Sequence, residues 1–147
     1  MGERMNGKGG FARVPCPMPG APQFSITVEH EFCAAHAITI AGTREPLHGH
    51  NFHVWVTVEG ATLDGDGLLC DFHTVQTALK DIVDPFTNRN LHDCPPFTSL
   101  NPSAENIARH IGDELHRRLG SALGPHARVA CVRVSEAPGC VAAYVRG

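Results

Sequence analysis

The pattern of apolar and polar residues in the first half of the chain predicts two β-strands. From Phe24 to Glu29 an apolar residue stands at every second position. A repeat of two is typical of a strand with one buried face, so we expect a strand from Phe24 to about Ile38. Residues 41–47 should form a loop. A second strand is expected from His50 to Glu59, with one apolar side formed by Phe52, Val54, Val56 and Val58.

Two later segments carry apolar residues at helical spacing. Asp71 can cap a first helix, expected over residues 72–86, and Pro85 would help to end it. A second helix is expected to begin near Ser103, directly after an Asn-Pro pair. The apolar stripes are Phe72, Val75, Leu79, Ile82, Val83 and Phe86 in the first helix, and Ile107, Ile111, Leu115 and Leu119 in the second.

The remaining elements complete an α+β fold. Residues 60–67 contain two Asp-Gly pairs, which are typical of turns, and a short return strand should follow over residues 68–70. Two final strands are expected over residues 128–136 and 140–146, separated by Ala-Pro-Gly. We therefore predict a four-stranded antiparallel sheet with both helices on one face.

Composition limits the domain organisation and the class of protein. Residues 1–22 are rich in Gly and Pro and are expected to be a flexible arm, and residues 23–147 a single domain. The chain is 42% hydrophobic and 18% charged, which indicates a globular protein. A net charge of −3 without a basic block argues against a nucleic-acid binder. No run reaches transmembrane length.

The cysteines and the N-terminus indicate a cytoplasmic protein. The six cysteines show no C-x-x-C spacing, and residues 1–23 lack the apolar stretch of a signal peptide. We expect the thiols to be reduced and mostly buried.

Histidines carry the candidate chemistry. The chain has 10 of them, and His48 and His50 stand two apart, so on a strand both rings project from one face. His36, near the end of the preceding strand, could supply a third ring. Three neutral imidazoles with an open coordination position are typical of a catalytic zinc site. The alternative is that the pair is only a surface or core feature.

Several motifs in order resemble the 6-pyruvoyl-tetrahydropterin synthase family, which includes 6-carboxytetrahydropterin synthases. The resemblance covers residues 24–147. Its motifs are A-A-H at 34–36, L-H-G-H-N-F at 47–52, the helix opened by Asp71-Phe72, N-P-S-A-E-N-I-A at 101–108, and E-x-x-G-C at 136–140.

This resemblance implies a fold and a site. The fold would be the tunnelling fold, in which the sheets of several subunits close into a barrel; the assembly would be a homohexamer of two trimers with sites at subunit interfaces. His36, His48 and His50 would hold Zn²⁺, and Glu136 would anchor a pterin, although a salt bridge across the sheet is its alternative. Ser103 and Glu105 would line the pterin pocket, or serve only as helix cap and dipole partner.

The sequence departs from the family pattern at the catalytic groups. Where the family has a cysteine, four residues before the first histidine of H-G-H, this chain has Arg44, and Glu45 follows it. The chain thus resembles a variant branch that uses glutamate. An Asp-His dyad of the family is replaced here, because the positions of its Leu-Asp-His motif fall on Phe86, Thr87 and Asn88.

Other groups near these positions could substitute for the missing ones. His92 could reach the pocket if its loop folds back. Cys33 is a poor candidate, because its parity on the strand is opposite to that of His36 and it is expected to be a buried thiol.

Three functions remain open. The first is a zinc-dependent lyase that converts 7,8-dihydroneopterin triphosphate or a related dihydropterin to 6-hydroxymethyl-7,8-dihydropterin, with Glu45 as proton-transfer group. The second is a 6-carboxy- or 6-pyruvoyl-tetrahydropterin synthase with rearranged catalytic residues, in which His92 is essential. The third is a catalytically silent pterin- or purine-binding module. A purely structural metal site is disfavoured, because three histidines leave a coordination position open.

Overall fold

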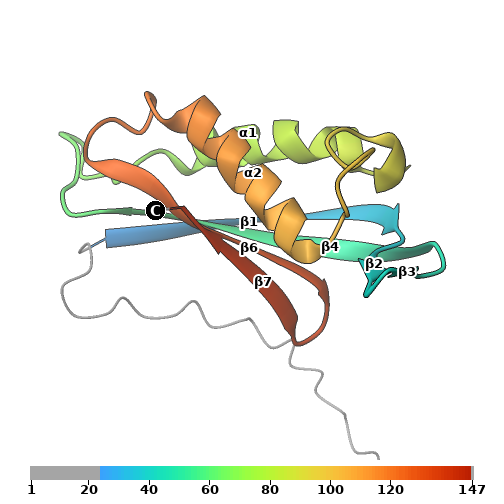
Figure 1. The fold of residues 1–147 in the computed structure, drawn as a ribbon. Coiled ribbons are helices and arrows are strands. Elements are labelled where there is room, and N and C mark those ends of the chain that lie inside the picture. The colour runs from blue at the N-terminus through green and yellow to red at the C-terminus, as the bar shows by residue number, and fades with distance from the viewer. Residues whose placement is uncertain (1–23, 147) are drawn as a thin grey trace, which may run out of the picture.

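The computed structural model describes residues 24–146, which form a β-sheet with two helices on one face (Figure 1). The predicted α+β class is confirmed. The flexible arm expected over residues 1–22 lies outside the described residues. The helices are α1 (Phe72–Val83) and α2 (Ala104–Leu119), and both pack on the sheet and on each other.

The sheet has the strand order β5-β1-β4-β6-β7. The four long strands pair with one another in antiparallel fashion, as predicted. The sheet also has a fifth strand that the sequence did not predict, the two-residue β5, which pairs in parallel with β1. The bounds are β1 (Phe24–His36), β4 (His48–Gly60), β5 (Arg89–Asn90), β6 (Ala127–Ala137) and β7 (Cys140–Val145).

The pairing of β1 with β4 sets the core face. It runs without a break from Phe24 opposite Gly60 to His36 opposite His48. Because side chains alternate between the two faces of a strand, every second residue of β4 points at the helices. These residues are fully buried, as the alternation predicted: Phe52, Val54, Val56 and Val58.

Helix boundaries follow local signals. The Asp71 carboxylate accepts a hydrogen bond from His73 N at 2.8 Å and starts α1. Pro85, which has no amide to continue the helical ladder, lies in the 3₁₀ turn η1 (Asp84–Phe86) that follows α1. The hydroxyl of Ser103 caps α2 through Asn106 N at 3.2 Å. Within the described residues, neither helix has the length and apolar character that a membrane crossing requires.

The prediction of a return strand over residues 68–70 is wrong. β4 already pairs with β1 on one edge and with β6 on the other, so a strand directly after β4 has no free edge beside it. Leu69 instead packs into the core, and its carbonyl oxygen lies 2.9 Å from His126 Nε2.

The loop expected over residues 41–47 is partly a small hairpin. Its strands are β2 (Thr39–Ile40) and β3 (Thr43–Arg44). Ala41 and Gly42 take φ values of 49° and 81°, and positive φ at both central residues is typical of the tight turn that matches strand twist. The hairpin returns the chain towards the start of β4.

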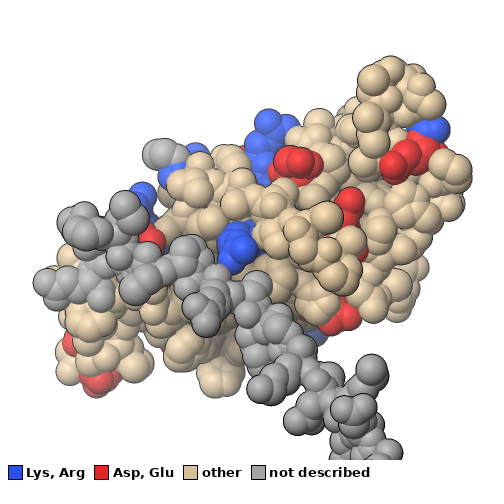
Figure 2. All heavy atoms as spheres, turned by 90° about the horizontal axis from the view of Figure 1, so that it is seen from below, with Lys and Arg blue, Asp and Glu red and all other residues tan. Residues whose placement is uncertain are grey.

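Polar side chains interact on the sheet face opposite the helices. Trp55 Nε1 donates to Glu29 Oε2 at 2.9 Å, and the Arg133 guanidinium stands over the Trp55 ring. His53 lies beside Glu31 at 3.2 Å. Figure 2, which views the molecule from this side, shows acidic and basic side chains interspersed over the part that the grey residues leave visible.

The cysteines differ from expectation in their burial. Among the described residues only Cys94 is buried, whereas Cys33 and Cys140 are exposed and Cys70 and Cys131 are intermediate. These five thiols are all free. The expected reduced state is therefore compatible with the structure, but the prediction that most thiols are buried is wrong.

The packing of α1 on the sheet can be tested by a matched pair of substitutions. Leu79 is fully buried, so Leu79→Ala should lower the free energy of unfolding by about 2–5 kcal/mol. Gln76→Ala, on the exposed side of the same helix, should change it by less than about 0.5 kcal/mol. Urea unfolding at one fixed protein concentration measures both, and similar values for the two variants would contradict the inward face of α1.

Candidate functional site

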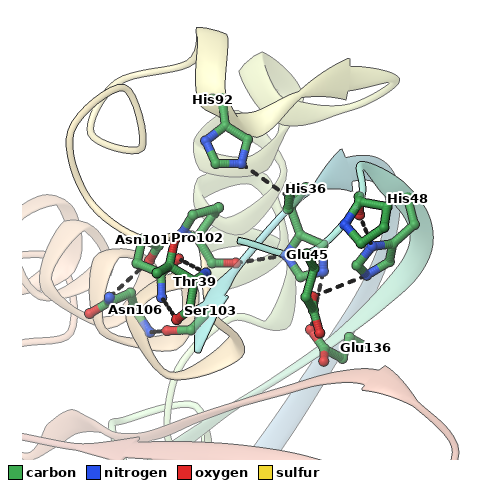
Figure 3. A network of polar contacts seen from close by, with 12 residues as sticks. His36, Thr39, Glu45, His48, His92, Asn101, Pro102, Ser103, Asn106 and Glu136 are labelled. Carbon is green, nitrogen blue, oxygen red and sulfur yellow. Dashed lines mark hydrogen bonds and ion pairs between the residues drawn. The ribbon is translucent and has the colours of Figure 1, made fainter. Parts of the chain in front are cut away.

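The three predicted histidines, His36, His48 and His50, meet at one end of the core face. Figure 3 shows two of them, His36 and His48. His36 is the last residue of β1 and lies directly opposite His48, the first residue of β4. His50 follows two residues later on the same face. The ring centroids lie 4.8–5.1 Å apart, and one nitrogen of each ring lies within 4.8 Å of those of the other two. The register of two strands thus assembles the cluster.

Backbone carbonyls fix the tautomer of two of the rings. His36 Nδ1 lies 2.8 Å from the oxygen of Pro102, and His48 Nδ1 lies 2.8 Å from the oxygen of Pro46. A carbonyl oxygen can only accept, so each ring must donate its Nδ1–H. In the neutral form of each ring the lone pair then lies on Nε2, which is the arrangement that metal-binding histidines require.

Burial keeps His36 in the neutral form. Its side chain is fully buried, and this desolvation is the largest influence on the ring: it lowers the pKa of His36 below the ordinary value. The hydrogen bond to Pro102 and the charge of Glu136 act in the opposite direction. A neutral imidazole is the form that binds a metal.

Two ring nitrogens of the cluster lack a partner. Nε2 of His36 and Nε2 of His50 are buried and make no hydrogen bond within the described structure. Buried polar atoms are rarely left unpaired in native proteins, and a metal ion between the rings would satisfy both. Three neutral imidazoles suit Zn²⁺, and other first-row transition metals also bind such sites. The donor set therefore fits a metal ion.

Glu136 faces the cluster from a third strand. It lies near the end of β6, at an irregularity between Ser135 and Ala137, on the same face as buried Val134. Its Oε2 is 3.5 Å from His36 Nε2, but the contact does not have hydrogen-bond geometry, and Oε2 is a further buried atom without a partner. The carboxylate thus retains an unused acceptor beside the histidines.

Glu45 approaches the cluster from the hairpin. Its amide donates to Ile38 O at 2.9 Å, which ties the end of the hairpin to its base. Its Oε2 lies 3.9 Å from His48 Nε2, beyond hydrogen-bond range, and its side chain is 36% exposed. A group at this distance can exchange a proton with a ligand held at the cluster, directly or through one water.

The other predicted site residues have structural contacts. His92 reaches the region, as expected if its loop folds back, but its Nε2 accepts from Ala37 N at 3.0 Å. Ser103 caps α2, and Glu105 is exposed in the first turn of that helix. Cys33 pairs with Asn51 on the opposite face of the sheet, as its parity predicted, although it is exposed.

Sequence reasoning missed the groups that orient the histidines. The carbonyls of Pro46 and Pro102 belong to the backbone, which any residue supplies, so no side-chain pattern identifies them. From the sequence, Asn101 is only part of the start of the second helix. Its side chain binds the backbone of Thr39, which no local signal in the sequence indicates.

The three histidines should act together in metal binding. Replacing any one of His36, His48 or His50 with Ala should weaken Zn²⁺ binding by at least about 100-fold, because loss of a supporting contact alone costs about 10–100-fold. Competition with a chromophoric chelator measures the affinity. His73→Ala is the control, because that side chain is 88% exposed and lies outside the cluster. Wild-type affinity in the His50→Ala protein would contradict the three-histidine site.

Known proteins resemble this chain in sequence and in structure. Over 94 residues, which are 64% of this chain and 76% of the relative, the chain is 35% identical to a dihydroneopterin monophosphate aldolase of Pyrococcus furiosus. The structure of 6-pyruvoyl tetrahydropterin synthase from Caenorhabditis elegans has a TM-score of 0.72 at 19% identity, covering 84% of this chain and 96% of that one.

A second solved structure carries a substitution in a catalytic glutamate. It is a Plasmodium vivax 6-pyruvoyltetrahydropterin synthase in which a catalytic glutamate is replaced by alanine. It has a TM-score of 0.70 at 22% identity and covers 84% of this chain and 97% of that one. At these identities the two structures establish the shared tunnelling fold. The sequence profile described as 6-pyruvoyl tetrahydropterin synthase matches residues 25–147, and the chain belongs to that family.

Proposed function

We propose that this chain is a zinc-dependent lyase that cleaves the C6 side chain of 7,8-dihydroneopterin triphosphate, or of a related dihydropterin such as the monophosphate, to give 6-hydroxymethyl-7,8-dihydropterin. The observation that carries this proposal is the position of Glu45, whose carboxylate lies 3.9 Å from Nε2 of His48 at the three-histidine cluster. The similarity to a dihydroneopterin monophosphate aldolase supports the same reaction class.

Zinc would polarise the substrate, and Glu45 would transfer the proton. Zinc held by His36, His48 and His50 would polarise the side-chain oxygens of the substrate and make a hydroxyl easier to deprotonate. Glu45 would accept the proton of the hydroxyl on the second side-chain carbon. The bond between the first two side-chain carbons then breaks, its electrons pass into the C6–N5 imine of the dihydropterin, and the second carbon leaves as an aldehyde.

Glu45 would be the only proton-transfer group that this reaction needs. The first side-chain carbon needs one proton after cleavage, and the proton that Glu45 took can be returned there. Atoms and charges balance without a second acid or base. This agrees with a site where Phe86, Thr87 and Asn88 occupy the positions of the family's Leu-Asp-His motif.

Glu136 would anchor the pterin ring. An ionised carboxylate can accept two N–H groups from the 2-amino-pyrimidinone edge in a paired arrangement. Support comes from its buried, unpartnered Oε2 beside His36. Ser103 and Glu105, at the start of α2, are proposed as further contacts at the pocket in addition to their roles at the helix start.

The second candidate is a 6-carboxy- or 6-pyruvoyl-tetrahydropterin synthase. The Plasmodium vivax enzyme with a catalytic glutamate is named a synthase, so a glutamate alone does not distinguish the two reactions. The synthase reaction needs two proton-transfer groups, and His92 would be the second. A silent binding module is the third candidate, and it predicts pterin binding without turnover.

Assembly and location extend the proposal. We propose a homo-oligomer, a hexamer of two trimers, with sites completed at subunit interfaces. One support is the outer edge of the sheet, where β7 exposes Val141 and Val145. Another is two exposed apolar residues, Ile40 in the hairpin and Leu47 directly before His48. The five free thiols of the described residues support a cytoplasmic location.

Product identification tests the lyase proposal. Zinc-loaded protein incubated with 7,8-dihydroneopterin triphosphate or monophosphate should release 6-hydroxymethyl-7,8-dihydropterin, detected by chromatography and mass spectrometry. Glu45→Gln should reduce the rate about 10²–10⁴-fold, because it removes the proton-transfer group. Glu59→Gln is the matched control: the same change near the other end of β4, with wild-type activity expected. A product with an oxidised or carboxylated side chain would support the synthase instead.

Substrate anchoring can be measured separately from turnover. Glu136→Gln should weaken binding of a dihydropterin by about 10–100-fold, because hydrogen bonds to a charged group contribute about 1.5–3 kcal/mol. Zinc affinity should stay within a few-fold of wild type, since Glu136 is not one of the three ligands. Equilibrium fluorescence titration gives the ligand affinity. A variant that binds the pterin as tightly as the wild type would contradict the anchoring role.

A further inference from the structure

The chain that follows His36 is held by a residue far away in the sequence. β1 ends at His36, yet the next residue, Ala37, is only 2% exposed. Its amide needs a partner inside the protein, because buried backbone donors are almost always paired. That partner is the ring of His92, whose Nε2 lies 3.0 Å from Ala37 N (Figure 3).

This contact defines the state of the His92 ring. Because Nε2 accepts from an amide, it carries no proton, and the neutral ring has its proton on Nδ1. His92 lies in the short turn η2 (Leu91–Asp93), and its own amide donates to Asn90 Oδ1 at 3.0 Å. Nε2 of His92 is therefore occupied by the hydrogen bond from the amide of Ala37.

Asn101 holds the same segment two residues further on. Its Oδ1 accepts from Thr39 N at 3.0 Å, and its Nδ2 donates to Thr39 O at 3.1 Å. These are the two bonds that a neighbouring strand would make. Asn101 is anchored in turn, because its carbonyl accepts from Asn106 Nδ2 in α2 at 2.9 Å. The carbonyl oxygen of the next residue, Pro102, accepts the hydrogen bond from Nδ1 of His36.

The held segment also forms the base of the hairpin that carries Glu45. Ile38 lies between the two held residues, and its carbonyl accepts from the amide of Glu45 at 2.9 Å. Any shift of residues 37–39 would therefore move two groups together: the ring of His36 and the carboxylate of Glu45.

We propose that His92 and Asn101 are positioning residues that hold residues 37–39, so that His36 presents Nε2 to the metal and Glu45 stands over the cluster. The inference rests on the metal site of the proposed function. This role differs from the proton transfer that a synthase reaction would require of His92. The two roles predict opposite effects of His92→Gln on turnover. Glutamine can accept a hydrogen bond from Ala37 N through Oε1, but it cannot transfer protons as histidine does.

The test compares His92→Gln with His92→Ala. In metal-free protein, hydrogen exchange of the Ala37 amide should be at least about tenfold faster in His92→Ala and within about threefold of wild type in His92→Gln. Zinc affinity should fall by about 10–100-fold in His92→Ala and be retained in His92→Gln, as should turnover. Asn101→Ala should speed exchange of the Thr39 amide and weaken zinc binding. His73→Gln serves as the exposed control.

The outcomes separate the possible roles. If His92→Gln keeps the slow Ala37 exchange and the zinc affinity but loses turnover as His92→Ala does, His92 transfers protons and the positioning role is overturned. The positioning role is also overturned if His92→Ala changes neither the hydrogen exchange of the Ala37 amide nor the thermal midpoint of the protein. The exchange measurement needs neither metal nor substrate. A wild-type chain that binds no zinc would therefore refute the proposed metal site, whereas faster Ala37 exchange in His92→Ala would still support the holding contact.

Discussion

The register between β1 and β4 is the constraint on which the site depends. It places His36 opposite His48 at the end of the core face. A slip of one residue would turn every side chain of one strand to the other face. The buried apolar residues of both strands, such as Val28 and Val56, prevent such a slip, because they would be exposed by it. The hydrophobic core thus selects the geometry of the histidine cluster.

The cluster lies where the core meets solvent, and its properties follow from that place. Phe52 is fully buried and packs against the rings of His36 and His50, whereas His48 is 38% exposed. The apolar side favours neutral imidazole, and the open side leaves room for a ligand. Without a metal, two buried ring nitrogens have no partner. Metal binding and stability should therefore be coupled, because a metal that binds only the folded chain stabilises it.

Periodicity predicted the parts of the fold that depend on local pattern. The alternation in β1 and β4 identified the buried face, and the two-residue spacing of His48 and His50 placed both rings on it. In each case the spacing of residues along one strand determines the direction of their side chains, and this spacing can be read from the sequence.

The features that were missed depend on contacts between distant segments. The prediction of a return strand at residues 68–70 was wrong because β1 and β6 occupy both edges of β4. The local pattern of residues does not indicate this strand order. The His92 contact joins residues 55 apart, and the His36–Pro102 contact joins residues 66 apart. The turn at Ala41 was missed because a positive φ is uncommon for alanine.

The central claim is that three imidazoles from two paired strands bind one metal ion. X-ray absorption spectroscopy at the zinc edge of the zinc-loaded protein tests it directly, because it counts the ligands and distinguishes nitrogen from sulfur. The account predicts three imidazole nitrogens at about 2.0–2.1 Å and one further light ligand. A sulfur ligand at about 2.3 Å, or fewer than three imidazoles, would contradict it.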